Sequence, residues 1–215
     1  MKITPLAFDS LGTRSMATNI ETKDVSIMID PAAALAPKRY GLPPSIIERE
    51  RLEEHLNLIT EQAKNCQVFI ITHYHYDHHN PNRPEIFKDK IALVKDPLHN
   101  INRSQKLRAR RFLDLIEPKE LRYCDSSKFK LKDTYIELSE PVFHGSDSKL
   151  GYVVEVLIKE GDERFVFTSD VEGPVSWEQT DFILLNYPKT VILDGPMTYM
   201  LGYRYSQDSF MSSIE

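Results

Sequence analysis

The chain has 215 residues and a mass of 24.9 kDa, a length that predicts a single domain over residues 1–215. Hydrophobic residues make up 41% and charged residues 27%, which excludes disordered and low-complexity classes. The net charge of -5 gives no overall attraction to nucleic acids or anionic membranes. No apolar run approaches the roughly 20 residues that cross a membrane, and no signal-peptide region is evident, so we expect a cytoplasmic protein without membrane spans.

The amino-terminal part of the chain predicts short strands. β-rich runs cover residues 3–8 and 25–29, and a polar loop over residues 10–18 is expected between them. Runs of this length bounded by turn residues are typical of an early hairpin or meander.

A long helix is expected next. Ser45 and Glu48 have the three-residue spacing of a capping box, so the helix should begin there. One face is apolar to about Lys64, with Leu52, Leu56, Ile59 and Ala63 recurring at helical spacing. His55 lies beside this stripe and is expected on the surface.

The remaining segments alternate between strands and helices. Buried strands are expected at residues 67–72 and 91–94, and a helix at 102–116. Further strands are expected at 121–124, 129–131, 135–138, 151–158, 164–168 and 190–193, with a hairpin turn at 161–162. Residues 177–187 give no clear pattern, and a last helix begins after Ser206. This alternation predicts an α/β fold.

The residues that carry chemistry follow the predicted strand at 67–72. Four imidazoles and one carboxylate lie within seven residues: His73, His75, Asp77, His78 and His79. His73 and His75 should share a side, because strand side chains alternate with a period of two. A following turn would bring Asp77 and His78 in from another direction. Mixed imidazole and carboxylate ligands at a strand end suit zinc chemistry, so a solvated loop without metal is the less favoured interpretation. His79 is expected to support the loop or a ligand by hydrogen bonding.

Two later residues also follow strand patterns. His144 ends the run Pro141-Val142-Phe143-His144, and Asp170 ends Phe167-Thr168-Ser169-Asp170. His144 alone would suit a buried, hydrogen-bonded histidine, but together with the earlier histidines it is a candidate ligand. Asp30 and Asp194 end strands too, and they are expected to cap a turn or orient a ligand.

The pattern His73-x-His75-x-Asp77-His78 after an apolar strand, followed by His144 and Asp170, resembles the signature of the metallo-β-lactamase superfamily. Residues 10–18 and 195–199 resemble an uncharacterised, largely archaeal branch of metallo-β-lactamase-like hydrolases, for which no single reaction is implied. The resemblance implies an αββα sandwich with metals at one edge of its two sheets. His73, His75 and His144 would hold the first metal. Asp77, His78 and a bridging Asp170 would hold the second.

One departure from the superfamily concerns its usual last histidine ligand, because no histidine follows His144. We therefore expect the fold to lack its last carboxyl-terminal elements and the second metal site to be incomplete. The resemblance favours zinc, with one or two ions per chain, since iron-containing oxygen reductases of the superfamily carry a glutamate where His75 stands. Manganese and iron stay open.

The leading functional prediction is a zinc-dependent hydrolase that uses a metal-activated hydroxide on a small ester, lactone or phosphoester. Asp77 would be catalytic, orienting the hydroxide and relaying a proton. One alternative is a phosphodiesterase or nuclease-like enzyme, suggested by a basic helix face: Arg103, Lys106, Arg108, Arg110 and Arg111. An ordinary solvated face is the favoured interpretation of this run. The other alternative is a metal-binding but catalytically inert module. A small-molecule substrate is the expected partner, nucleic acid is not favoured, and a homodimer stays open.

Overall fold

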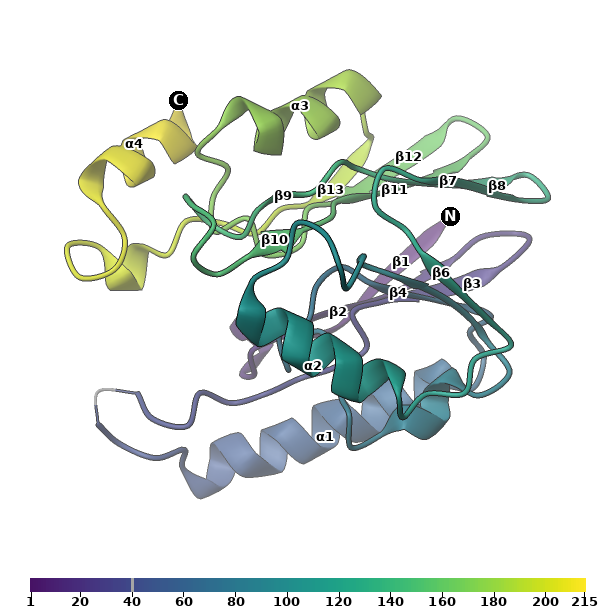
Figure 1. The fold of residues 1–215 in the computed structure, drawn as a ribbon, viewed down its shortest axis with the longest axis horizontal. Coiled ribbons are helices and arrows are strands. Elements are labelled where there is room, and N and C mark those ends of the chain that lie inside the picture. The colour runs from purple at the N-terminus through teal and green to yellow at the C-terminus, as the bar shows by residue number, and fades with distance from the viewer. Residues whose placement is uncertain (40) are drawn as a thin grey trace. The chain divides into compact units, whose positions relative to one another are not determined.

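The chain forms two compact units in a computed structural model that describes residues 1–39 and 41–215 (Figure 1). The amino-terminal unit comprises Met1–Pro97 and Ser104–Tyr123, and the carboxyl-terminal unit comprises Leu98–Arg103 and Cys124–Glu215. None of the helices in the described ranges has the length and apolar character needed to cross a membrane.

The amino-terminal unit is built on a six-stranded sheet. Its strands follow chain order: β1 (Lys2–Phe8), β2 (Met16–Glu21), β3 (Ser26–Ile29), β4 (Val68–Ile71), β5 (Ile91–Val94) and β6 (Glu120–Tyr123). β1 to β3 form the predicted antiparallel meander, and β3 to β6 are parallel. The predicted loop at 10–18 is too long, because β2 begins at Met16. This strand is buried from Met16 to Ile20 and therefore lacks the alternation that marks a half-buried strand.

Helices α1 (Ile46–Ala63) and α2 (Arg103–Leu113) lie on one face of this sheet (Figure 1). The predicted capping box is present: the Glu48 amide donates to Ser45 Oγ at 3.2 Å, and the Ser45 amide donates to Glu48 Oε2 at 2.7 Å. The expected surface position of His55 is wrong. Its side chain is buried and its Nδ1 lies 2.7 Å from Thr13 Oγ1, so it belongs to the face that packs.

The carboxyl-terminal unit is built on a five-stranded sheet in the order β13, β12, β11, β8, β7. The bounds are β7 (Lys128–Leu131), β8 (Thr134–Leu138), β11 (Val156–Glu160), β12 (Glu163–Phe167) and β13 (Thr190–Ile192). The hairpin predicted at 161–162 is confirmed by the pairing of Glu160 with Glu163. A separate hairpin joins β9 (Val142–Phe143) to β10 (Tyr152–Val153).

The predicted strand at 151–158 is two strands rather than one. β10 pairs with β9, whereas β11 pairs with β8 and β12, so the chain changes sheets at residues 154–155. At this change Ser139 bonds to both backbone groups of Glu155, through its Oγ at 2.9 Å and its amide at 3.0 Å.

Two helices complete the carboxyl-terminal unit, α3 (Trp177–Asn186) and α4 (Gln207–Ile214). The last helix follows Ser206 as predicted, and Ser206 Oγ accepts from the Ser209 amide at 2.9 Å. α3 occupies the segment for which the sequence gives no clear pattern. Within the described chain Gln179 is the buried residue of this helix. The helix therefore has no buried apolar stripe from which the sequence could predict it. Among the described residues, short 3-10 helices lie at Asp9–Leu11, Pro84–Phe87 and Thr198–Met200.

Candidate metal centre

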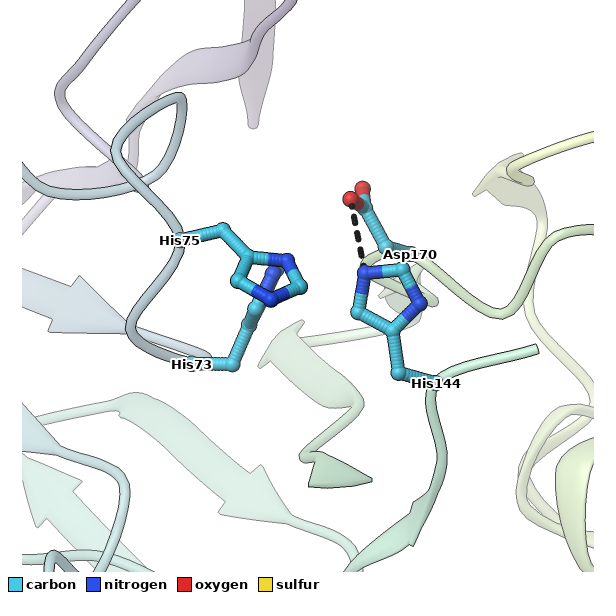
Figure 2. Close-up of side chains that lie close together, drawn as sticks. All are labelled: His73, His75, His144 and Asp170. Carbon is cyan, nitrogen blue, oxygen red and sulfur yellow. Dashed lines mark ion pairs between the residues drawn. The ribbon is translucent and has the colours of Figure 1, made fainter. Parts of the chain in front are cut away.

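The histidines of the motif gather directly after β4 in the amino-terminal unit. The His73 ring centroid lies 4.7 Å from that of His75 and 4.1 Å from that of His78. Figure 2 shows the close approach of the His73 and His75 rings. His73 and His78 are fully buried, whereas His75 is half-buried. The turn that follows is closed by the His78 amide, which donates to the His75 carbonyl at 3.0 Å.

Asp30, at the end of β3, holds His78 and the end of β4. One carboxylate oxygen accepts from the Thr72 amide at 2.8 Å, and the other lies 2.7 Å from Thr72 Oγ1 and 2.8 Å from His78 Nδ1. Burial raises the pKa of Asp30, while His78 and Thr72 offset part of the rise. Asp30 therefore orients a candidate ligand, as expected. Since Nδ1 of His78 contacts Asp30, Nε2 is the His78 atom that a metal would bind.

Asp77 forms an ion pair that could not be predicted from the sequence. Its Oδ2 lies 2.8 Å from Nη2 of Arg14, and the Asp77 side chain is buried whereas that of Arg14 is partly exposed. The Arg14 backbone is fixed by two hydrogen bonds with Ala34, at 3.0 and 2.9 Å. Arg14 lies 63 positions before Asp77 and outside the histidine motif, so only the fold brings this guanidinium to the candidate site.

His79 supports the motif loop from inside the amino-terminal unit. Its Nδ1 lies 2.8 Å from the carbonyl oxygen of His75. Because a carbonyl oxygen only accepts hydrogen bonds, Nδ1 carries the proton. Burial lowers the pKa of His79 to about 3, so the ring is neutral near pH 7. The ring also contacts three aromatic side chains, those of Tyr74, Tyr76 and Phe112.

The carboxyl-terminal unit brings His144 and Asp170 together. His144 directly follows β9, and its Nε2 lies 3.3 Å from Asp170 Oδ2 (Figure 2). Its other ring nitrogen lies 3.5 Å from Oε1 of Glu172, a residue for which the sequence gives no signal beyond its nearness to Asp170. Asp194 accepts from the Glu172 amide at 2.7 Å and so steadies this turn.

Gly145 allows the Glu172 carboxylate to approach His144. This glycine has a φ of +76°, and a Cβ at this position would clash with the Glu172 carboxylate. The left-handed backbone favours glycine here, and the Glu172 carboxylate would have to shift to admit a Cβ.

The donor atoms within each unit suit a divalent metal. Ligand atoms of His73 and His75 lie within 4.8 Å of each other, and the same holds for Asp77 with His78. In the carboxyl-terminal unit it holds for His144 with Asp170. Imidazole nitrogens combined with carboxylate oxygens are the donors that zinc uses in catalytic sites. The residues of each unit therefore fit the kind of metal that the sequence pattern implies.

Comparison with solved structures shows which fold these units build. The chain is similar to an isothiocyanate hydrolase from Delia radicum gut bacteria, with a TM-score of 0.61 and 16% identity, over 91% of this chain and 73% of that one. It is also similar to a possible metal-dependent hydrolase from Veillonella parvula DSM 2008, with a TM-score of 0.54 and 16% identity, over 85% and 69% of the two chains. Likeness at this level of identity shows the fold alone, and the predicted metallo-β-lactamase-like fold class is confirmed.

Comparison of sequences shows the family. No protein-family model matches the chain. A UPF0282 protein of Korarchaeum cryptofilum (strain OPF8) is 57% identical over 216 residues, which cover 100% of this chain and 72% of that protein. A UPF0282 protein of Metallosphaera sedula is 50% identical over 221 residues, with the same coverage. The predicted archaeal branch is thus confirmed. The chain belongs to the UPF0282 protein family.

Proposed function

We propose that this chain is a zinc-dependent hydrolase that acts on a small ester, lactone or phosphoester. In this proposal His73, His75 and His144 hold the first metal, and Asp77, His78 and Asp170 hold the second. Bound divalent ions supply a water of lowered pKa and polarise the bond under attack. The wider family resemblance supports the joining of these six residues in one centre.

The observation that carries the proposal is the cluster after β4. Three imidazoles in ring contact and one carboxylate lie at the carboxyl end of a buried parallel strand: His73, His75, His78 and Asp77. Asp30 fixes the ring of His78 through a 2.8 Å contact to Nδ1. Such a carboxylate–histidine contact is the usual support of a metal ligand. A surface histidine loop would not need this burial or this support.

Asp77 has the position and the charge for proton transfer. Its carboxylate would accept a hydrogen bond from the attacking water and pass the proton to the leaving group. The 2.8 Å ion pair with Arg14 fixes this carboxylate in place. Because Asp77 is buried, a lost partner would leave its carboxylate uncompensated.

Metal content and turnover test the proposal together. We expect purified protein to contain zinc and to hydrolyse 4-nitrophenyl acetate, a simple lactone or bis(4-nitrophenyl) phosphate. An isothiocyanate belongs in the same panel because one similar structure carries that name. Asp77→Asn should lower turnover about 100-fold or more while the first zinc is retained. The exposed Asp114→Asn is the matched control and should leave turnover unchanged.

Two outcomes would contradict the proposal. Protein that binds no metal, measured by inductively coupled plasma mass spectrometry, would exclude the hydrolytic centre. One tightly bound zinc without turnover on any substrate of the panel would support the alternative of a metal-binding but catalytically inert module.

A phosphodiester substrate is a second candidate, favoured by one contact. The Arg108 guanidinium lies 4.8 Å above the ring of Tyr76, which stands between His75 and Asp77 in the motif. A cation beside the motif loop suits an anionic substrate. Arg108→Gln should then raise KM for bis(4-nitrophenyl) phosphate but not for 4-nitrophenyl acetate. The exposed Arg110→Gln is the control, and equal effects on both substrates would remove this candidate.

A further inference from the structure

Gln179 has a buried side-chain amide that hydrogen-bonds to backbone groups at both of its ends. It lies in the first turn of α3 and is 1% exposed. Its Nε2 donates to the carbonyl oxygens of Phe143 at 3.0 Å and Gly145 at 2.8 Å. Its Oε1 accepts from the amides of Val175 at 2.8 Å and Ser176 at 3.2 Å. Both ends of one buried amide are therefore satisfied by backbone groups.

The partners of Nε2 flank the proposed ligands. Phe143 and Gly145 are the residues immediately before and after His144. A third, longer contact of 3.4 Å reaches the carbonyl oxygen of Val171, which directly follows Asp170. The backbone around His144 and the backbone beside Asp170 are thus tied to the same atom.

We propose that Gln179 is a positioning residue that sets the backbone of His144 and Asp170 for metal binding. The metal part of this inference rests on the proposed function. The 3.3 Å separation of His144 Nε2 from Asp170 Oδ2 depends on where the two loops lie. Gln179 fixes the loops against the start of α3, and Glu172 contacts the other ring nitrogen of His144.

A glutamine suits this task because one planar group carries two N–H donors and a carbonyl acceptor. Glutamate has the same size and keeps the acceptor for Val175 and Ser176. Its second oxygen would replace Nε2 and face carbonyl oxygens, which accept but cannot donate. Methionine has a similar length and removes both functions without placing a charge in the buried site.

The test compares Gln179→Glu and Gln179→Met with Thr180→Val. Thr180 is the next residue of the same helix, and its hydroxyl bonds only to Ser176 and Trp177 among the contacts described. We expect both Gln179 variants to bind zinc about 10- to 100-fold more weakly in chelator competition, measured where circular dichroism shows a folded chain. The visible absorption spectrum of bound Co²⁺ should change in the same variants. Thr180→Val should keep the parent affinity and spectrum.

Further outcomes decide between positioning and simple packing. An unchanged Co²⁺ spectrum with parent-like zinc affinity in Gln179→Met would overturn the inference. A second readout needs no metal: exchange of the His144 amide, which donates to the Gly151 carbonyl at 3.0 Å, should accelerate about 10-fold or more in Gln179→Met. If the parent chain bound no metal, the proposed function would fail. If, in addition, the His144 amide of Gln179→Met exchanged at the same rate as in the parent chain, positioning by Gln179 would also be refuted.

Discussion

At the scale of single residues, Glu155 places a carboxyl group in the interior of the protein. It is fully buried, and neither carboxylate oxygen has a hydrogen-bond partner within the described part of the chain. Burial raises its pKa well above the ordinary value for a glutamate. The folded state therefore binds this proton more tightly than the unfolded state does. It follows that the stability linked to Glu155 is greatest below pH about 4.5 and falls as pH rises through the folded-state pKa.

Glu155→Gln should raise stability at alkaline pH. We expect the free energy of unfolding at pH 8 to increase, because the variant has no proton to lose. The difference from the parent chain should shrink as pH falls toward 5. Urea unfolding at both pH values measures it, with the exposed Glu50→Gln as the control. A variant less stable than the parent at pH 8 would show that Glu155 makes a favourable interaction.

Some residue roles could be predicted from the sequence and others could not. The motif from His73 to His78 is contiguous, so its clustering follows from one strand and one turn. Asp30 was expected to cap or orient because it ends a strand, and it contacts His78. Arg14 lies in the run 10–18, which indicates the family but no role for this residue, and Gln179 belongs to no motif. Their contacts depend on loop and helix placement, which local pattern does not encode.

At the scale of elements, the capping box at the start of α1 is the clearest local signal in the chain. The reciprocal bonds between Ser45 and Glu48 satisfy backbone amides that a helix start otherwise leaves to water. These bonds also lower the pKa of Glu48. The helix then buries Leu56, Ile59 and Ala63. The cap and the apolar stripe therefore both indicate the same helix.

Ser45→Ala should destabilise the chain by about 1 kcal/mol through loss of this cap. Unfolding in guanidinium chloride or urea at pH 7 measures the change. The midpoint denaturant concentration should fall, whereas the dependence of the unfolding free energy on denaturant concentration should stay the same. Ser212→Ala, at an exposed position of α4, should change stability by less than about 0.5 kcal/mol. Equal effects at the two positions would mean that the box contributes nothing beyond an exposed serine.

Strands and helices were predictable where the buried residues are also apolar, and they were missed where the buried residues are polar. β4, β5 and β12 are short apolar runs and lie as predicted. β2 was not predicted, because Thr18 and Asn19 are polar yet buried inside the sheet. α3 was missed because a glutamine, rather than an apolar residue, is its buried contact.

At the scale of the whole molecule, the fold class was predicted from the order of the candidate ligands along the chain. The motif follows β4 in the amino-terminal unit, and His144 and Asp170 follow β9 and β12 in the carboxyl-terminal unit. That order gave the resemblance to the metallo-β-lactamase superfamily, and the TM-score of 0.61 confirms the fold. The division into two compact units has no counterpart in composition, and the single domain expected over residues 1–215 stays a prediction.

Metal binding should stabilise the whole chain, since ligands bind the folded state in preference to the unfolded one. Zinc at about 100 times its Kd should add about 2.7 kcal/mol, which corresponds to a rise in Tm of roughly 5–10 °C for a chain of this size. Chelation should reverse the rise, as measured by differential scanning calorimetry. His144→Ala and His73→Ala should each abolish most of it, whereas Ser212→Ala should not. Persistence of the full rise in both histidine variants would refute the proposed ligand set.

The parallel pairing of β3 with β4 has a practical consequence for tethering a reporter to this protein. The pairing of Ile29 with Ile70 brings Asp30 beside Thr72 at one sheet edge, whatever connects the two strands. Pro37 and Lys38 are exposed within that connection. A fluorescent tag inserted between them would lengthen the linker without altering strand registry, and so it could follow metal loading from outside the sheet.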